Sequence, residues 1–453
     1  MINILILAAG KGTRMQSERP KVLHTLAGKP LLQHVLDTAA TLTSTLPTVI
    51  VGHGAEAVKA TLAENSANFV TQEQQLGTGH AVAQALPYVD DEAPVLILCG
   101  DVPLIQATTL QSLMKLVSDT QMGLLTINLE NPDGYGRILR DQNNRVVSIV
   151  EQKDATQEQC SITEINTGIM AIKGEHLKRW IPKLSNDNAQ QEYYLTDIIA
   201  LAQEDNIAVA SESATTLWEV QGVNNRQQQA ELERYYQHYL AEQLMARGVT
   251  LYDPARIDCR GELTVGSDVV IDINCVFEGA VSLGSGVVIG PNCTIKDATI
   301  GDNTQIHANS VIDSSIVDAN CNIGPFARLR PGTQLAQGVK VGNFVETKKA
   351  IVGLGSKINH LSYIGDALIG EDVNIGAGTI TCNYDGVNKF TTTIKDHVFV
   401  GSNSALVAPV VINEGATIGA GSTINTDVDN DALALARVRQ RQVKGWQRPQ
   451  KKK

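Results

Sequence analysis

The chain has 453 residues, of which 43% are hydrophobic and 19% charged, and its net charge is −11. This length is too great for one compact core, so we expect two or three globular domains. The negative charge, with no nucleic-acid reader motif, argues against a nucleic-acid partner, and the lack of an apolar run near 18 residues argues against a membrane span.

The seven cysteines show no CxxC spacing, which favours reduced thiols over a disulfide framework or a zinc site. The chain opens directly on an expected strand over residues 2–7, without the charged lead and apolar core of a signal peptide. Together these features predict a cytoplasmic protein.

Residues 1–226 alternate short apolar stretches with longer amphipathic ones. We predict strands over residues 4–7, 48–51, 95–98 and 124–127, and helices over residues 30–40, 79–85 and 108–117. This alternation is typical of an α/β domain with a mostly parallel, Rossmann-like sheet.

A Gln/Glu-rich segment follows, over residues 227–247, and Gly248 supplies a stop signal after it. Its apolar residues recur at helical spacing: Leu232, Tyr235, Tyr236, Tyr239, Leu240 and Leu244. We predict a linker helix here and assign it no chemistry.

From Leu263 onward the apolar period becomes six, within a predicted domain over residues 248–453. One run consists of Val265, Ile271, Phe277, Leu283, Ile289 and Ile295, and a second of Ile394, Val400, Leu406, Ile412, Ile418 and Ile424. A six-residue period with one inward aliphatic side chain per strand predicts a parallel β-helix of hexapeptide repeats. The many glycines and the aromatic content of only 4% suit its tight corners and narrow interior.

Two further features stand out in this half. The register is interrupted between Ile375 and Ile394, and we predict that the segment containing residues 381–386 is a loop pushed out on the binding face. The tail after Asp431 is basic throughout, so we expect it to be solvated or to complete a site for an anionic ligand.

A glycine-rich turn, Leu7-Ala8-Ala9-Gly10-Lys11-Gly12-Thr13-Arg14-Met15, follows the first strand, and Pro20-Lys21 comes shortly after. Its spacing fits neither the dinucleotide fingerprint nor the P-loop. Such a turn lets backbone N–H groups approach phosphates, and Lys11, Arg14 and Lys21 supply charge for a triphosphate.

Asp101 ends the apolar strand over residues 95–98, at the carboxyl edge of the predicted sheet. Ligands of parallel α/β sheets bind at this edge. A carboxylate that faces a triphosphate there is a natural Mg²⁺ ligand, because Mg²⁺ usually takes only one or two protein ligands. The alternative is a solvated loop aspartate.

The glycine-rich turn resembles the signature of the sugar-nucleotide pyrophosphorylases, which join a nucleoside triphosphate to a sugar 1-phosphate. The later segments that contain Gln72, Gly77, Asp101, Gly136, Glu151, Asn166 and Asn224 match the same family in the same order. The resemblance implies attack of the sugar phosphate on the α-phosphorus of UTP, with no protein nucleophile. It implies Asn224 as the second Mg²⁺ ligand, Gln72, Gly77 and Thr78 at the uracil, Gly136, Glu151 and Asn166 at the sugar, and further nucleotide contacts from Leu7, Ala8, Ala9, Gly10, Lys21, Cys99, Gly100 and Asp101. Cys99 departs from the family, which usually has an aromatic residue there.

In the β-helix, His360 lies between a cationic pair, Arg330 and Lys348, and the predicted loop after Ile375. Acetyl transfer to an amine needs a base of near-neutral pKa, and histidine is the usual side chain for it. A cationic pair suits a sugar phosphate. These neighbours favour His360 as a general base over a structural histidine.

Over essentially its whole length the chain resembles the bifunctional N-acetylglucosamine-1-phosphate uridyltransferase/glucosamine-1-phosphate acetyltransferases. The resemblance implies a left-handed β-helix, a homotrimer, direct acetyl transfer with His360 as base, and UDP-N-acetylglucosamine for peptidoglycan and lipopolysaccharide. It implies Arg330, Lys348, Tyr363 and Asn374 at glucosamine 1-phosphate, and Ala377, Asn383, Tyr384, Ser402, Ala420 and Arg437 at acetyl-CoA. UTP and acetyl-CoA are then co-substrates and Mg²⁺ the cofactor.

Two other functional hypotheses fit the sequence. One is a monofunctional sugar-nucleotide pyrophosphorylase whose β-helix is only regulatory or oligomeric, since the fold alone does not decide function. The other is a scaffold or nucleotide-sensing subunit, against which Lys21, Asp101 and the glycine-rich loop weigh.

Overall fold

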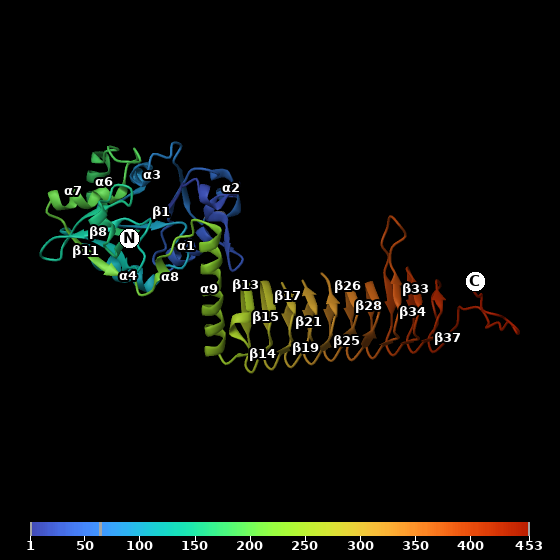
Figure 1. Ribbon diagram of the computed structural model, residues 1–453. Helices are drawn as coiled ribbons and strands as arrows, with labels where there is room; N and C mark the ends of the chain where they lie inside the picture. The colour runs from blue at the N-terminus through green and yellow to red at the C-terminus, as the bar shows by residue number, and fades with distance from the viewer. Residues whose placement is uncertain (1, 63–65, 452–453) are drawn as a thin grey trace. The chain divides into compact units, whose positions relative to one another are not determined.

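The computed structural model describes residues 2–62 and 66–451. The chain divides into two compact units, the first ending at Tyr236 and the second beginning at Gln237, so that the boundary falls within helix α9 (Arg226–Ala246) (Figure 1). Within the described residues, no helix has the length and apolar character that crossing a bilayer requires.

The first unit is built on a mostly parallel sheet. Its central strands β1, β4, β5 and β6 are parallel, while β10 runs antiparallel to both β6 and β7, and a hairpin of β8 (Arg137–Arg140) and β9 (Val146–Val150) extends from β10. Along the sheet the order is β11 (Ala208–Ser213), β7 (Gln121–Asn128), β10 (Glu164–Lys173), β6 (Pro94–Cys99), β1 (Asn3–Ala8), β4 (Thr48–Val51) and β5 (Asn68–Thr71). The predicted Rossmann-like fold is therefore confirmed.

Both faces of this sheet are covered, which explains the nearly continuous apolar strands. In β1, Ile4 and Ile6 belong to one hydrophobic cluster and Leu5 to another. The first cluster includes residues of α1 (Leu31–Ala40), α2 (Ala55–Thr61) and α4 (Ala107–Met114). The second includes residues of α3 (Thr78–Ala85), α6 (Gly174–Trp180) and α7 (Ile198–Glu204).

The predicted strands and helices of this unit all form, with one clear error at a helix end. Helix α4 stops at Met114, whereas the prediction extended it to residue 117. Residues 115–117 contribute Leu116 and Val117 to the packing without being helical, so an apolar pattern persists past the end of the helix. Two short helices, α5 (Gln157–Cys160) and α8 (Leu217–Val220), complete the unit.

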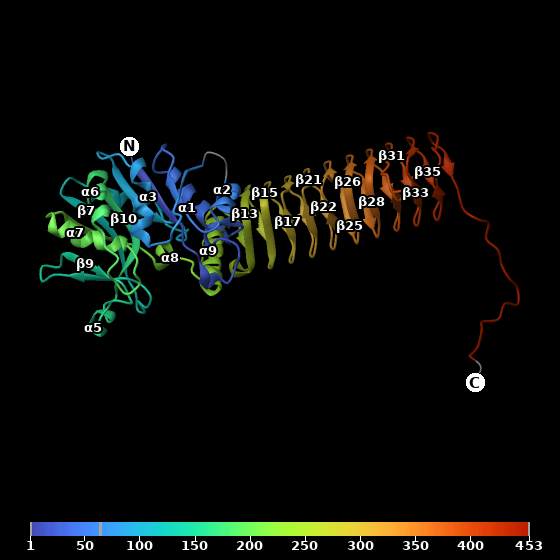
Figure 2. The ribbon, with the colours of Figure 1, turned by 90° about the horizontal axis from the view of Figure 1, so that it is seen from above.

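The second unit is a parallel β-helix, seen from two sides in Figures 1 and 2. Its first ladder is an 11-stranded parallel sheet of β12 (Thr250–Leu251), β14 (Val270–Ile271), β16 (Val288–Ile289), β19 (Gln305–Ile306), β22 (Asn322–Ile323), β25 (Lys340–Asn343), β27 (Lys357–His360), β29 (Asn374–Ile375), β32 (Phe399–Val400), β35 (Thr417–Ile418) and β37 (Leu433–Ala434).

The two other ladders share long strands that turn a corner, and so form one 15-stranded sheet. The long strands are β13 (Ile257–Val265), β15 (Cys275–Leu283), β26 (Glu346–Val352) and β28 (Tyr363–Ile369). One ladder adds β17 (Thr294–Lys296), β20 (Val311–Asp313), β23 (Arg328–Leu329), β30 (Ile380–Cys382), β33 (Ala405–Val407) and β36 (Thr423–Ile424), and the other β18 (Thr299–Ile300), β21 (Ile316–Val317), β24 (Gln334–Leu335), β31 (Thr392–Ile394) and β34 (Val410–Ile412). Parallel strands in three ladders are the arrangement of the left-handed β-helix that was predicted.

The six-residue period identifies the interior correctly. Eleven of the twelve residues in the two apolar runs are at most 5% exposed, and Val265 packs partly buried against the same core. Most coils close in 17 or 18 residues, as the pairings Phe277↔Ile295 and Ile295↔Ile312 show, whereas the coil that contains the projecting segment takes 25, from Asn374 to Phe399. The 17-residue coils explain why the strict period breaks after Ile295.

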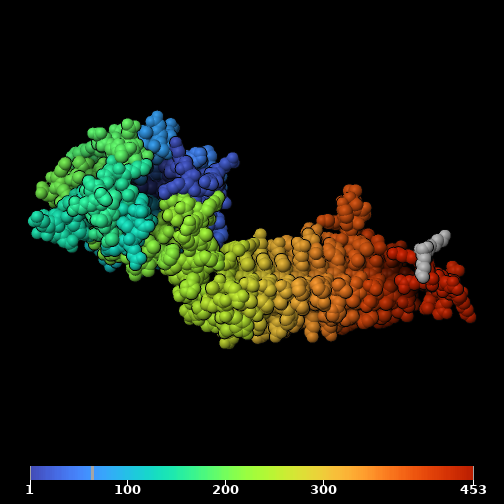
Figure 3. All heavy atoms as spheres, in the orientation of Figure 1, coloured from blue at the N-terminus to red at the C-terminus, as the bar shows by residue number. Residues whose placement is uncertain are grey.

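The predicted loop after Ile375 is shorter than the gap in the apolar pattern. Thr381 occupies the next inward position, six residues after Ile375, and is 1% exposed within β30. Only residues 383–391 leave the β-helix, and they form the projection visible in Figures 1 and 3. A polar side chain at an inward position hid one strand from the sequence pattern.

Gln237 closes the first coil of the β-helix, which has no preceding coil to pair with. Its side chain is 3% exposed, accepts the N–H of Cys259 at 2.7 Å, and donates to the carbonyl of the same residue at 2.8 Å. An open sheet edge is thereby satisfied by a side chain.

We expect Gln237→Leu to weaken this end of the β-helix by about 2–4 kcal/mol, because it leaves a buried N–H and a buried carbonyl without partners. Hydrogen–deuterium exchange in β13 should accelerate accordingly. Gln243→Leu, on an exposed position of the same helix, should leave exchange unchanged. Equal exchange in the two variants would contradict the capping role.

Candidate functional sites

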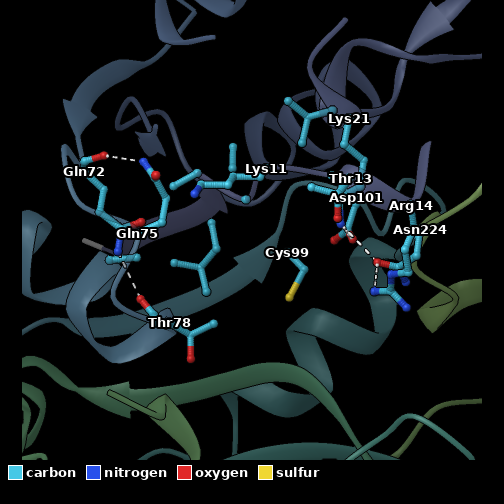
Figure 4. A pocket seen from close by; sticks show the side chains of 18 of the residues that line it. Lys11, Thr13, Arg14, Lys21, Gln72, Gln75, Thr78, Cys99, Asp101 and Asn224 are labelled. Atoms are coloured by element: carbon cyan, nitrogen blue, oxygen red, sulfur yellow. Dashed lines mark hydrogen bonds and ion pairs between the residues drawn. The ribbon is translucent and has the colours of Figure 1, made fainter. Parts of the chain in front are cut away.

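A cavity of about 540 Å³ opens at the carboxyl ends of β1 and β6 in the first unit (Figure 4). It is the kind of place where ligands of open α/β sheets bind. Eleven of the predicted nucleotide-site residues line it: Leu7, Ala8, Ala9, Gly10, Lys21, Gln72, Gly77, Thr78, Cys99, Asp101 and Asn224. Four others, Gly100, Gly136, Glu151 and Asn166, do not.

The glycine-rich loop turns at Gly12, which has a φ of +61° and precedes a short 3₁₀ helix, Thr13–Met15. A Cβ at this glycine would lie 2.7 Å from Cβ of Lys21. Both the backbone conformation and the contact therefore require glycine. The close approach places Lys21 directly against the loop.

Lys21, Asp101 and Asn224 form one polar cluster in the cavity. The Lys21 ammonium makes an ion pair with Asp101 Oδ2 and donates to Asn224 Oδ1 at 3.2 Å. Arg14 Nη2 donates to the same Asn224 oxygen at 3.0 Å. Segments far apart in the sequence thus bring two side-chain oxygens, of Asp101 and Asn224, into contact with two cations, Lys21 and Arg14.

These two oxygens suit a divalent ion such as Mg²⁺. One carboxylate and one amide oxygen are a typical protein contribution, with water and phosphate oxygens as the other ligands. Within residues 2–62 and 66–451, no group of three His, Cys, Asp or Glu side chains could hold a metal. A metal at Asp101 and Asn224 would therefore share its coordination with the substrate.

A tight turn carries the residues predicted at the base. Gly77 has a φ of +108°, and a Cβ there would lie 2.6 Å from the carbonyl oxygen of Tyr193. Gln72 is 3% exposed and donates to the Gly77 carbonyl at 3.0 Å, and Thr78 Oγ1 accepts the N–H of Leu195 at 3.0 Å. These hydrogen bonds hold the turn between Gln72 and Leu195 and fix the Gly77 carbonyl and the Thr78 hydroxyl in place.

The residues predicted at the sugar meet one another where β8 begins and β9 ends, beside β10. The N–H of Asn166 donates to the Gly136 carbonyl at 2.9 Å, and a Cβ on Gly136 would lie 3.5 Å from the Glu151 carboxylate. Thr196 donates to Glu151 at 3.2 Å. Burial raises the pKa of Glu151, and the neighbouring Asp197 raises it further.

Cys99 lines the cavity and also contacts β10, the strand that contains Asn166. Its thiol donates to the Gly168 carbonyl at 3.8 Å, and burial raises its pKa to about 12, so that it stays neutral. Gly100 lies behind it, with its N–H donated to the Leu7 carbonyl at 2.9 Å.

The cavity also contains residues that the sequence analysis did not assign. Gln75 Nε2 donates to the Gln72 carbonyl at 3.1 Å, and its position three residues after Gln72 was the only available signal. Glu192 also lines the cavity. No sequence pattern connects Glu192 to residues more than a hundred positions earlier.

In the second unit, His360 ends β27 and is exposed. Its Nδ1 lies 2.9 Å from Oδ1 of Asn343, its partner on β25. An amide oxygen only accepts, so Nδ1 carries the proton and Nε2 presents a lone pair. A base oriented in this way can take a proton from an amine. Asn343 was not predicted, because the coil length that aligns it with His360 is not visible in the sequence.

The predicted sugar-phosphate residues lie on two faces of the β-helix. Lys348 and Tyr363 lie on β26 and β28, and Arg330 follows β23 and pairs with Glu346 at 2.7 Å. Asn374 instead lies in the 11-stranded sheet, opposite Lys357. The structure therefore brings three of these residues onto neighbouring strands and leaves Asn374 apart.

Lys389 is a further cation that the sequence analysis missed. It lies on the returning side of the projecting segment, bridged to Tyr384, and its ammonium contacts Lys348 and lowers the pKa of Lys348. Two adjacent ammonium groups with Arg330 nearby favour an anion. At the base of the same segment, Asn383 donates to Asp366.

Four predicted acetyl-CoA residues share one corner of the β-helix with His360. The carbonyls of His360, Ala377 and Ser402 accept N–H groups from successive coils, and Arg437 donates to the Ala420 carbonyl at 2.8 Å. With coils about 4.8 Å apart, Ala420 lies about 14 Å along the axis from His360. This column of residues, which starts at His360 and ends at Arg437, is long enough for an extended ligand.

Models of known protein families match separate parts of the chain. The MobA-like NTP transferase domain matches residues 4–135, the GMPPB C-terminal domain residues 259–352, and six bacterial transferase hexapeptide repeats residues 391–426. A solved structure of UDP-glucose pyrophosphorylase with UDP-glucose matches 52% of this chain and 98% of its own, with 18% identity and a TM-score of 0.43.

Two curated relatives match along their whole length. "Bifunctional protein GlmU" of Cellvibrio japonicus is 63% identical over 452 residues and covers 100% of both chains. The protein of the same name from Marinobacter nauticus is 60% identical over 450 residues and covers 99% of each. The chain therefore belongs to the family of bifunctional GlmU proteins, as its motifs predicted.

Proposed function

We propose that the chain acetylates glucosamine 1-phosphate with acetyl-CoA and then couples the product, N-acetylglucosamine 1-phosphate, to UTP. The products of the second step are UDP-N-acetylglucosamine and pyrophosphate. The observation that carries this proposal is that each unit holds its own cluster of reactive groups, one around Lys21 and Asp101 and one around His360.

For uridyl transfer, a phosphate oxygen of the sugar phosphate attacks the α-phosphorus of UTP, and the bond to the pyrophosphate oxygen breaks. No protein nucleophile is needed. The glycine-rich loop approaches the triphosphate with backbone N–H groups, and Lys11, Arg14 and Lys21 offset its charge. Gln72 and Thr78 would orient the uracil, and Glu151 and Asn166 the sugar.

Asp101 and Asn224 would hold Mg²⁺. When bound, this ion would stabilise negative charge on the phosphate oxygens as pyrophosphate leaves. The pairing of both oxygens with the single Lys21 ammonium supports the assignment, because they already converge on one positive charge.

For acetyl transfer, the amine nitrogen attacks the thioester carbonyl carbon of acetyl-CoA while Nε2 of His360 takes a proton from the amine. The C–S bond then breaks and the thiolate of CoA leaves. Arg330, Lys348 and Tyr363 would hold the sugar phosphate. The cofactor would lie along the corner that contains Ala377, Asn383, Tyr384, Ser402, Ala420 and Arg437.

The hexapeptide repeats indicate an oligomer, and we propose a homotrimer with its acetyl-transfer sites between copies. Phe326, Phe344 and Leu361 each have a positive φ and are 49%, 56% and 62% exposed at the corner beside His360. Exposed, strained apolar side chains in a column need a partner surface. A second copy could also supply the Asn374 that one chain holds on another face.

We expect Asn343→Ala to lower kcat of acetyl transfer by about 10–100-fold, because the imidazole loses the acceptor that fixes its tautomer. Asn343→Asp, which keeps an acceptor oxygen, should retain more activity than the alanine variant. Steady-state release of the CoA thiol measures both. Equal losses in the two variants would contradict a positioning role for this side chain.

We expect Lys389→Ala to raise KM for glucosamine 1-phosphate by about tenfold, the effect of losing one charged contact. Lysine binds an anion only below its pKa, so binding weakens as pH rises through the lowered pKa of Lys348. Without Lys389 this loss should move to higher pH. KM measured across the pH range tests both effects, with the exposed Lys395→Ala as the unaffected control.

The whole proposal is tested with the purified full chain and Mg²⁺. Glucosamine 1-phosphate, acetyl-CoA and UTP together should yield UDP-N-acetylglucosamine, with free CoA and pyrophosphate in equal amounts. N-Acetylglucosamine 1-phosphate should give the same nucleotide sugar without acetyl-CoA. If no CoA is released under any condition, the chain is a monofunctional pyrophosphorylase and the acetyltransferase assignment fails.

A further inference from the structure

The ammonium of Lys21 contacts the two oxygens that we propose as metal ligands. It pairs with Asp101 Oδ2 and lies 3.2 Å from Asn224 Oδ1, and Figure 4 shows the three side chains converging. Arg14 shares the Asn224 oxygen. The Lys21 ammonium therefore contacts the same two oxygens that a divalent ion would use.

This position is poorly solvated. The side chains of Lys21 and Asp101 are only 15% and 18% exposed. Charges that are partly withdrawn from water interact more strongly than those on an open surface. A divalent ion and the ammonium would therefore repel each other strongly if both contacted Asp101.

Only the end of the Lys21 side chain is free to leave. Its backbone belongs to a 3₁₀ turn, with its carbonyl accepting the N–H of His24 at 3.1 Å, and its Cβ packs against Gly12. The flexible four-carbon stem can still swing the ammonium. The glycine-rich loop borders the same cavity, so the nearest destination for the charge is a bound triphosphate.

We propose that Lys21 holds the metal site closed in the nucleotide-free protein and exchanges places with the divalent ion when the triphosphate arrives. The metal alone then binds weakly, since it must displace a paired ammonium. With the triphosphate present, the ammonium gains new anionic partners and releases Asp101 and Asn224. This inference rests on the proposed metal site and adds the coupling between metal and nucleotide.

The exchange predicts that the affinity for a divalent ion rises when Lys21 is replaced by a neutral residue. In Lys21→Met the two oxygens lose their competitor, so the free protein should bind Mn²⁺ alone at least about fivefold more tightly than the wild type. A purely structural ion pair predicts no such gain. Lys11→Met is the matched control, because Lys11 lines the same cavity but lies away from Asp101 in Figure 4.

The experiment titrates Mn²⁺ into the nucleotide-free full chain and follows free Mn²⁺ by electron paramagnetic resonance. Lys11→Met should change the dissociation constant by less than about twofold, although it removes the same charge. Asp101→Asn should weaken binding at least about tenfold. Circular dichroism confirms that each variant is folded, and Lys21→Gln replaces Lys21→Met if the latter is not.

The outcomes separate two failures. Unchanged or weaker Mn²⁺ binding in a folded Lys21 variant, with binding still dependent on Asp101, would overturn the exchange and leave the metal site standing. Binding that is indifferent to Asp101→Asn would overturn the metal site itself. An equal gain in the Lys11 and Lys21 variants would reduce the effect to general electrostatics and would also overturn the exchange.

Discussion

His360→Ala should slow acetyl transfer from acetyl-CoA to glucosamine 1-phosphate by about 10²–10⁴-fold, the usual contribution of a general base. The exposed imidazole is oriented by Asn343 at 2.9 Å and lies at the start of the corner column that ends at Arg437. Without it, the attacking amine loses the group that we propose takes its proton. Single-turnover release of CoA measures the loss.

A second histidine provides the control. His307 also lies in the β-helix and has an asparagine partner, with Nε2 3.0 Å from Oδ1 of Asn322. His307→Ala should change acetyl transfer by less than about threefold, because a histidine–asparagine pair away from the cationic cluster has no reacting group to serve. Uridyl transfer should be nearly unchanged in both variants. Loss of both activities in folded His360→Ala would disprove separate sites.

Asp101→Ala should have the opposite effect, with a loss of about 10²–10³-fold in kcat/KM for pyrophosphate release from UTP and N-acetylglucosamine 1-phosphate. The substitution removes the only carboxylate proposed to hold the metal and leaves Lys21 without its anionic partner. Acetyl transfer should continue, because His360 belongs to the other unit.

The Mg²⁺ dependence of the residual activity gives an independent reading. If Asp101 is a metal ligand, the Mg²⁺ concentration that gives half-maximal rate should rise in Asp101→Ala and more modestly in Asp101→Asn. Asp91→Ala is the control, since Asp91 pairs with Lys178 and does not line the cavity. A normal Mg²⁺ requirement in Asp101→Ala would place the metal elsewhere.

Local patterns predicted the architecture well. In β1, alternate residues enter two different cores, so an apolar run between turn signals was enough to identify a strand covered on both faces. In the β-helix each turn repeats one environment, so a period of six located the interior almost without error. The error at residues 381–382 arose where Thr381, a polar residue, takes an inward position.

The contacts within the sites needed the fold. Lys389 meets Lys348 because residues 383–391 project and return, and Asn343 meets His360 because one coil takes 17 residues. Neither distance along the chain carries a signal. In the nucleotide cavity, Lys21 meets Asp101 because the parallel strands β1 and β6 end at the same sheet edge, and Asn224 joins them because the N–H of Val223 is donated to the Asp101 carbonyl at 2.9 Å.

By itself, the sequence determined the strands and inward residues, the glycine-rich loop and, through its motifs, the family. Each of these follows from short-range periodicity or from a contiguous stretch of residues. The tertiary structure alone decided which charges touch: the ammonium that pairs with the proposed metal ligands, the amide that orients His360, and the lysine beside Lys348. These depend on strand register and coil length, which bring distant residues within a few ångströms of each other.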